Sequence, residues 1–180
     1  MKVVATNIDA IWVIESPVAG DERGAFWRGY DRAVFAAQGL ETRIEQTSVS
    51  HNPRAGTLRG MHYQVAPHEE AKLVRCVRGR VYDVGVDLRP WSKTYCRAFG
   101  IELAADSPTA LYLGPGIAHG FVTLTDDTTL FYQISAPYEA TAARGVRWDD
   151  PIFRIAWPRA PVIVSERDRM YPDYVPMPSR

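Results

Sequence analysis

Residues 72–88 read KLVRCVRGRVYDVGVDL, two runs of strand-forming residues joined through Arg78-Gly79-Arg80. Valine and tyrosine favour strands, and a glycine between two such runs is typical of a hairpin connection. The same pattern recurs along the chain, because each run is bounded by Gly, Pro, Asp or Asn. The predicted strands are residues 10–14, 43–49, 58–64, 72–77, 81–88, 96–103, 109–113, 121–124 and 130–135, with a second hairpin turn at 125–128.

Helices are few in this pattern. Residues 32–38 form the one regular helix predicted, with Asp31 as its N-cap and Gly39 past its end. A weak helical turn is predicted near residues 166–170. Many short strands with close turns predict an all-β fold, an antiparallel jelly-roll sandwich or barrel with short peripheral helices.

Composition indicates a globular chain without a charge-driven partner. Hydrophobic residues make up 46% and charged residues 23% of the 180 residues, and 21 basic residues balance 21 acidic ones. This balance argues against nucleic acid or a membrane surface as a partner. No apolar run approaches the ~20 residues of a membrane span, and residues 1–7 turn polar too soon for a signal peptide. We therefore expect a cytoplasmic protein with Cys76 and Cys96 as reduced thiols.

We expect residues 1–180 to form a single domain, since this length suits one ordinary core. The proline-rich segment from about residue 158 should wrap the surface of that domain.

The densest polar chemistry lies in LRGMHYQ at residues 58–64, followed by KLVR at 72–75. These segments place a guanidinium, an imidazole, an amide and an ammonium on what we predict to be two neighbouring strands. A buried neighbourhood holds so many polar groups only if something satisfies them. An anionic, oxygen-rich ligand would do so, and we therefore predict an active site here.

Period-two alternation predicts which of these side chains point inward. Each polar residue then shares a face with apolar neighbours, as a group lining a cavity would. The predicted faces are Lys72 with Val74 and Cys76, Tyr132 with Leu130 and Ile134, and His62 with Leu58, Gly60 and Gln64.

His62 and His119 raise the question of a metal, since two histidines on barrel strands can be a ligand pair. A metal would want a further histidine and a nearby carboxylate. Gln64 stands where that histidine would lie, and the Lys72 ammonium would repel a cation. We predict no metal and no other cofactor. The carboxylates of Glu69-Glu70 keep a metal-dependent oxygenase or isomerase as an alternative.

Ordered motifs along most of the chain carry a family resemblance. They are DERGAF at 21–26, Gln46 with Ser50, LRGMHYQ at 58–64, AKLV at 71–74, RGRVYDVGVDLR at 78–89, PGIAHGF at 115–121, WDDP at 148–151 and IAWP at 155–158. Together they resemble the dTDP-4-dehydrorhamnose 3,5-epimerases, metal-free cupins of nucleotide-sugar metabolism. The resemblance implies a cupin-type jelly roll, a dTDP-linked 4-keto-6-deoxyhexose as substrate, and a homodimer with exchanged N-terminal strands.

Epimerisation beside a ketone needs a base, a group that holds the enolate oxygen, and an acid on the opposite face. His62 suits the base, because a neutral imidazole can take a proton near neutral pH. The resemblance gives it a carboxylate partner, best matched by Asp168. Tyr132 suits the acid, and Lys72 would stabilise the charge that develops on O4.

The resemblance also implies the residues that bind the nucleotide. Arg23 and Arg59 would contact the pyrophosphate, since arginine binds phosphate through paired N–H groups. Phe26 and Tyr138 would stack or pack against the thymine base. Contacts to the sugar are expected from Gln46, Ser50 and His119, and Ser48 is expected to bind the substrate as well.

Three positions depart from the family pattern, namely Arg28 in place of Glu, Ser48 in place of Asn, and Glu70 where Gln is frequent. Arg28 reverses a charge near a substrate-facing segment. The exact nucleotide sugar is therefore open, and so is whether C3, C5 or both are inverted. A 3-only or 5-only epimerase of a specialised nucleotide sugar is one alternative. A catalytically silent sugar-nucleotide binding module is another.

Overall fold

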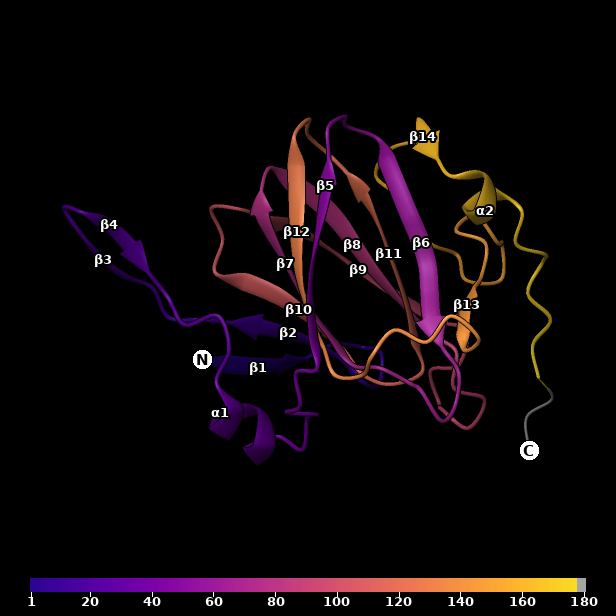
Figure 1. The fold of residues 1–180 in the computed structure, drawn as a ribbon, viewed down its shortest axis with the longest axis horizontal. Helices are drawn as coiled ribbons and strands as arrows, with labels where there is room; N and C mark the ends of the chain where they lie inside the picture. The colour runs from indigo at the N-terminus through magenta and orange to yellow at the C-terminus, as the bar shows by residue number, and fades with distance from the viewer. Residues whose placement is uncertain (178–180) are drawn as a thin grey trace.

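The computed structural model describes residues 1–177 and consists mainly of two antiparallel sheets (Figure 1). In spatial order, the first sheet holds β1 (Lys2–Ala5), β2 (Ile11–Glu15), β10 (Thr109–Leu113), β7 (Lys72–Arg78), β12 (Thr128–Ile134) and β5 (Gln46–Asn52). The second holds β13 (Ala143–Gly145), β6 (Thr57–Gln64), β11 (Ile117–Thr123), β8 (Arg80–Asp87) and β9 (Ala98–Ala104), with β14 (Ile163–Val164) parallel beside β6.

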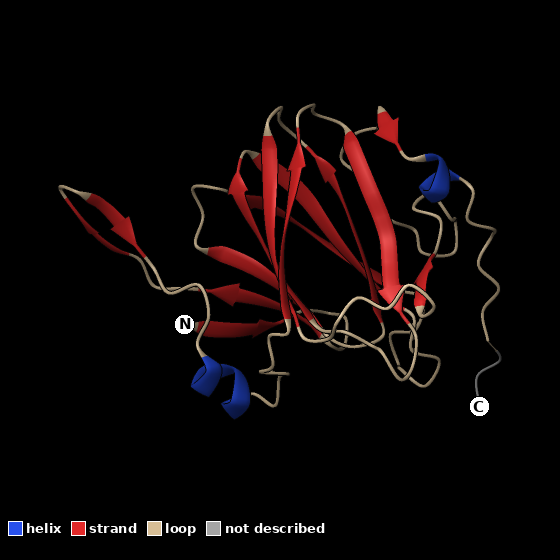
Figure 2. Cartoon of the chain, viewed as in Figure 1, coloured by secondary structure: helices blue, strands red, loops and turns tan. Residues whose placement is uncertain are grey.

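Among residues 1–177, two strands and two helices lie outside these sheets. Strands β3 (Ala19–Asp21) and β4 (Gly24–Phe26) form a separate two-stranded sheet. The helices are α1 (Arg32–Ala37) and α2 (Glu166–Arg169), and both lie at the periphery in Figure 2. The predicted all-β antiparallel architecture with short peripheral helices is confirmed. No helix among residues 1–177 is long and apolar enough to cross a membrane.

Two turns predicted as hairpins instead connect strands of different sheets. Gly79 links β7 to β8, and residues 124–127 link β11 to β12. The two corners pack together, because the Arg80 N–H donates to Thr125 Oγ1 at 3.0 Å. Local turn residues reverse the chain, but burial decides which strand becomes the partner. The two polar segments at 58–64 and 72–75 therefore lie in opposite sheets, and the prediction of neighbouring strands is wrong.

The main core lies between the two sheets and is apolar. Ile11, Val74 and Leu111 of the first sheet pack with Val81 and Phe121 of the second, and all five are almost wholly buried. Two smaller clusters cover the outer faces. Residues 146–174 contribute to the cluster on the second sheet, and α1 covers part of the first.

The boundaries of two elements test the local sequence signals. Helix α1 is confirmed, since the Asp31 side chain caps it by accepting from Ala33 N at 3.0 Å. The strand predicted at 121–124 begins earlier, so His119 lies within β11. Gly120 marks a close backbone approach rather than a loop, since a Cβ there would lie 2.9 Å from the Arg59 carbonyl oxygen. Cys76 and Cys96 are free thiols, as predicted.

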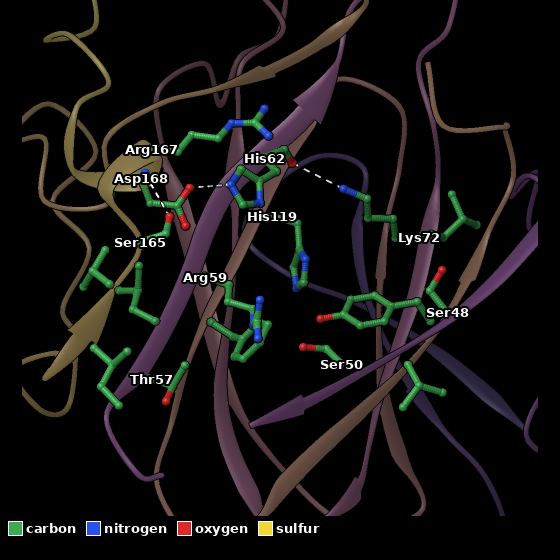
Figure 3. A pocket seen from close by; sticks show the side chains of 17 residues that line it. Ser48, Ser50, Thr57, Arg59, His62, Lys72, His119, Ser165, Arg167 and Asp168 are labelled. Carbon is green, nitrogen blue, oxygen red and sulfur yellow. Dashed lines mark hydrogen bonds and ion pairs between the residues drawn. The ribbon is translucent and has the colours of Figure 1, made fainter. Parts of the chain in front are cut away.

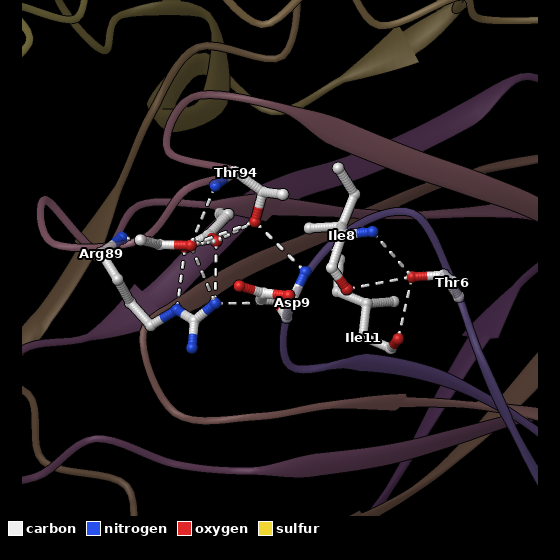
Figure 4. A network of polar contacts seen from close by, with 8 residues as sticks. Thr6, Ile8, Asp9, Ile11, Arg89 and Thr94 are labelled. Atoms are coloured by element: carbon white, nitrogen blue, oxygen red, sulfur yellow. Dashed lines mark hydrogen bonds and ion pairs between the residues drawn. The ribbon is translucent and has the colours of Figure 1, made fainter.

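A buried carboxylate ties the N-terminal turn to the second sheet (Figure 4). Asp87 is completely buried and accepts hydrogen bonds from Arg89 Nη2 at 2.8 Å, Ser92 Oγ at 2.6 Å and Thr94 Oγ1 at 2.7 Å. The backbone of Asp9 joins through its N–H to Thr94 Oγ1 and its carbonyl to Arg89. Burial raises the pKa of the Asp87 carboxyl, but the hydrogen bonds outweigh it and hold that pKa below the ordinary 3.8.

Asp87→Asn should destabilise the fold, because it leaves the largely buried Arg89 guanidinium without its counter-ion. We expect the free energy of unfolding at pH 7 to fall by about 3 kcal/mol in urea titrations. The lowered pKa also means that this stabilisation is present above about pH 4 and is lost as the pH falls through the folded-state pKa. Asp9→Asn is the matched control, since only the Asp9 backbone joins the network. Equal stability of the two variants would contradict this role.

Candidate active site

A cavity of about 560 Å³ opens between the two sheets (Figure 3). Strands β5, β7 and β12 line one side and β6 and β11 the other, while β14 and α2 form part of the rim. The structure brings eight of the predicted site residues to this cavity, namely Ser48, Ser50, Arg59, His62, Lys72, His119, Tyr132 and Asp168.

A bulge turns two key side chains of β6 toward the same cavity. Arg59 pairs with Phe121 and His62 pairs with His119, and the register shifts between these two pairs. Two residues of β6 therefore face a single residue of β11. Cross-strand partners share a face, so Arg59 and His62 both line the cavity although they are three residues apart.

The predicted alternation in this strand is thus wrong. Strict period two would put His62 on the face of Leu58 and Gly60 and send Arg59 to the other side. Gly60 has φ +133°, and a Cβ there would lie 2.5 Å from Gly120 Cα, so glycine is required where the strand bulges. The alternation predicted for β7 is confirmed. Lys72 lines the cavity, and Val74, two residues further along the strand, belongs to the core between the sheets.

His62 and Asp168 form a close pair at the rim. The distance from His62 Nε2 to Asp168 Oδ1 is 2.7 Å, and the Asp168 side chain is only 4% exposed. Gly60 N donates to the other carboxylate oxygen at 3.2 Å, while Ser165 caps α2 by accepting from Asp168 N. Burial raises the pKa of the Asp168 carboxyl, but the hydrogen bonds from His62 and Gly60 outweigh it and leave that pKa below its ordinary value. An ionised Asp168 accepts from Nε2–H and leaves Nδ1 of His62 as the basic nitrogen.

A second histidine–carboxylate pair lies deeper and was missed by the sequence reasoning. His119 Nε2 is 2.8 Å from Asp83 Oδ1, and both side chains are nearly or completely buried. Asp83 is two residues after buried Val81 in β8, so period two would have placed both side chains on the inner face. A carboxylate pointing into a core needs a partner, so this pattern was the available signal.

Tyr132 approaches from the sheet opposite His62. Its ring meets the His119 ring edge-on, with centroids 5.8 Å apart. Burial raises the pKa of the Tyr132 phenol well above 10; the nearby Asp83 charge adds to this, while Arg59 and Ser50 oppose it. The phenol is therefore protonated at neutral pH and can donate.

The Lys72 ammonium forms an ion pair with the carboxylate of Glu70. Its Nζ lies 2.8 Å from Glu70 Oε1 and donates to the His62 carbonyl at 3.3 Å. Both the Lys72 and Glu70 side chains are 11% exposed, so the pair is shielded from solvent. Glu70 is one of the three departures noted in the sequence, and it makes this part of the wall a charge-balanced pair.

An adjoining cavity of about 310 Å³ is lined by two more of the predicted site residues. Gln46 and Tyr138 line it, and Gln46 Oε1 accepts from Tyr138 N at 3.0 Å. Arg167 lines both cavities and was not among the predicted site residues. Its position beside Asp168 in the sequence was the only signal for it.

Arg23 and Phe26 do not line the cavity of their own chain, so their predicted contacts with the nucleotide stay a prediction. They lie on the β3–β4 hairpin, which projects away from the body in Figure 1. Phe26 is 71% exposed, and the Arg23 side chain pairs with Asp21 on the same hairpin. The motif DERGAF specifies this hairpin locally but gives no information on where it points.

Known proteins are similar to this chain over almost its whole length. A family model described as dTDP-4-dehydrorhamnose 3,5-epimerase matches residues 5–175. The chain belongs to the dTDP-4-dehydrorhamnose 3,5-epimerase family. It is 37% identical over 169 residues to the enzyme of that name from Shigella flexneri, with 93% of each chain covered. It is 39% identical over 170 residues to a dTDP-4-dehydrorhamnose 3-epimerase from Streptomyces niveus, covering 94% of this chain and 82% of that one.

A solved structure of an epimerase extends the likeness to the fold. It is the dTDP-6-deoxy-D-glucose-3,5-epimerase of Legionella pneumophila in complex with dTDP-4-keto-L-rhamnose. The TM-score is 0.87 at 31% identity, covering 93% of this chain and 89% of that one. As a member of this epimerase family, the protein is an isomerase of dTDP-sugars on a cupin-type jelly roll, as the resemblance implied.

In the part of the chain that the structure describes, no group of three or more His, Cys, Asp and Glu side chains is placed to hold a metal ion. The sequence-based expectation of a metal-free enzyme stays a prediction, which chelation can test.

Proposed function

We propose that the protein inverts C3 and C5 of a dTDP-4-keto-6-deoxyhexose through an enolate, in a deoxysugar pathway of the dTDP-rhamnose type. One observation carries this proposal. A histidine–carboxylate pair and a protonated phenol line one cavity from opposite sheets, as two-face proton transfer needs. The sugar bound to the Legionella pneumophila relative supports the substrate class.

The proton transfer begins at His62. Its Nδ1 removes the proton from the carbon beside the C4 ketone, and the C–H electron pair moves to form the enolate with charge on O4. Asp168 stabilises the imidazolium that forms and holds the tautomer. In this proposal the Lys72 ammonium stabilises the charge on O4, and His119, which is paired with Asp83, hydrogen-bonds the sugar.

Tyr132 completes the inversion by giving its phenolic proton to the opposite face of the same carbon. The phenolate recovers a proton from solvent, and His62 releases its own, so that no net proton is gained or lost. C3 and C5 both flank C4, so one enolate oxygen site serves both carbons once the sugar ring shifts.

The remaining residues bind the nucleotide in this proposal. Arg59 contacts the pyrophosphate and Tyr138 the thymine base. Sugar hydroxyls or O4 receive hydrogen bonds from Gln46, Ser48, Ser50 and His119, of which all except Gln46 line the larger cavity.

Arg23 and Phe26 reach the substrate only if a second chain supplies them. We propose a homodimer in which the β3–β4 hairpin of each chain enters the partner's cavity, which the exposure of Phe26 supports. Mixing an Arg23→Ala/Phe26→Ala chain with a His62→Ala chain should restore activity, because a mixed dimer then has one complete site. No recovery, although mixed dimers form, would contradict the exchange.

The proposal is tested with dTDP-4-keto-6-deoxyglucose in deuterated water, using enzyme dialysed exhaustively against a chelator. We expect full activity and replacement of the protons at both C3 and C5, followed by proton NMR. Exchange at C3 alone would support the second candidate, a 3-epimerase like the Streptomyces niveus relative. Activity that returns only with one divalent ion would contradict the metal-free assignment, and no turnover would indicate a binding module.

A further inference from the structure

Tyr171 is placed next to the proposed base by a glycine that leaves room for it. Gly145 of β13 pairs directly with His62 of β6, so the two residues share a face of the sheet. A Cβ at Gly145 would lie 2.5 Å from the Tyr171 hydroxyl oxygen and closer still to two of its ring carbons. The Tyr171 ring therefore occupies the space that a side chain at position 145 would fill.

Two groups of the site contact this tyrosine. Its ring meets the His62 ring edge-on, with centroids 6.4 Å apart and planes at 68°. Its hydroxyl accepts a hydrogen bond from Arg167 Nε at 2.9 Å. Arg167 lines both cavities. The Tyr171 side chain therefore contacts both the proposed base and a cationic residue of the cavity wall.

Asp168 lies on a short helix whose C-terminal end is held in place by Tyr171. Helix α2 has only four residues, and Tyr171 follows it three positions after Asp168. Packing of Tyr171 against Gly145 therefore fixes the end of this segment against β13, beside the strand that carries His62.

We propose that Tyr171 is a positioning residue with two separable effects. Its ring holds the His62–Asp168 pair in register, and its hydroxyl holds Arg167 toward an anionic diphosphate in the cavity. The inference rests on the proposed role of His62 as the base. Ring and hydroxyl can be removed separately, so the two effects predict different kinetic changes.

The test compares three variants with two matched controls. Tyr171→Leu removes ring and hydroxyl, Tyr171→Phe removes the hydroxyl alone, and Gly145→Ala displaces the ring without changing it. Gly100→Ala is the control for the glycine, because a Cβ there would lie 2.5 Å from the ring of Tyr82, which does not line the cavity. The control for the hydroxyl is Y174F, which removes the 2.7 Å contact between the Tyr174 and Tyr95 hydroxyls.

Tyr171→Leu and Gly145→Ala should lower kcat roughly 10- to 100-fold, because small displacements of a proton-transfer group are costly. Tyr171→Phe should keep kcat and raise KM a few-fold, through Arg167. Gly100→Ala and Tyr174→Phe should leave both constants unchanged, even where melting temperature falls. The ¹⁵N shifts of the His62 ring should change in Tyr171→Leu and Gly145→Ala and not in Tyr171→Phe.

Unchanged kcat and unchanged His62 ¹⁵N shifts in Tyr171→Leu and Gly145→Ala would overturn the proposal. A kcat loss in Tyr171→Phe as large as in Tyr171→Leu would overturn the separate role of the ring. His62→Ala is measured alongside these variants. If His62→Ala loses proton exchange while Tyr171→Leu keeps a normal kcat, only the inference about Tyr171 fails. If His62→Ala still exchanges protons freely, the proposed function fails.

Discussion

His62→Ala is expected to abolish both deuterium uptake from solvent and net inversion of the sugar. In the proposed mechanism His62 is the base, and the Asp168 carboxylate that is paired with its ring stabilises the imidazolium. General acid–base groups contribute roughly 100- to 10000-fold, which sets the size of the loss. The measurement is proton NMR of the substrate in deuterated water.

The matched control is His51→Ala, since His51 is an exposed histidine on β5 that pairs with Asp127 and does not line the cavity. It should exchange and invert at the normal rate. The exchange and inversion rates of Asp168→Asn should lie between those of His51→Ala and His62→Ala, because the imidazole remains while its carboxylate partner is lost. Free exchange in His62→Ala would show that another group is the base.

Lys72→Ala should reduce kcat by roughly 100- to 1000-fold, the usual cost of losing one group that stabilises developing charge. The charge on O4 exists mainly in the transition state, so KM should change far less. Steady-state kinetics with dTDP-4-keto-6-deoxyglucose would separate the two constants. A rise in KM with kcat untouched would make Lys72 a ground-state anchor instead.

The ion pair with Glu70 calls for a second variant. Removing Lys72 alone leaves a shielded carboxylate without its partner, which could disturb the cavity by itself. The double variant Lys72→Ala/Glu70→Gln removes that charge as well. If its kcat stays as low as that of Lys72→Ala, the loss comes from the ammonium; recovery of kcat would assign the loss to the stranded carboxylate.

Much of the fold could be predicted because strand periodicity and turn residues are local signals. Lys72 and Tyr132 lie on the inner face that alternation gave them, and Asp31 caps the predicted helix. The bulge in β6 could not be predicted in the same way, since it depends on Gly60 meeting the backbone of Gly120 on another strand. That contact rotates His62 and Arg59 onto one face.

The assignment of strands to sheets also lay beyond local signals. A glycine turn such as Gly79 serves a hairpin and a sheet-crossing corner equally well, and only core packing separates them. Asp83 was missed because its partner His119 is 36 residues away in sequence. Arg23 and Phe26 were assigned to the site through a motif, and a single chain leaves them outside it.

The central claim is that His62 and Tyr132 transfer protons on opposite faces of the same carbon. The most direct test measures deuterium uptake at C3 and C5 together with product configuration, in His62→Ala and Tyr132→Phe. We predict that Tyr132→Phe keeps part of the uptake, because His62 can return a deuteron to the face it deprotonated, while inversion falls far more. His62→Ala should lose both. Inversion at the normal rate in Tyr132→Phe, or free exchange in His62→Ala, would contradict the two-face assignment.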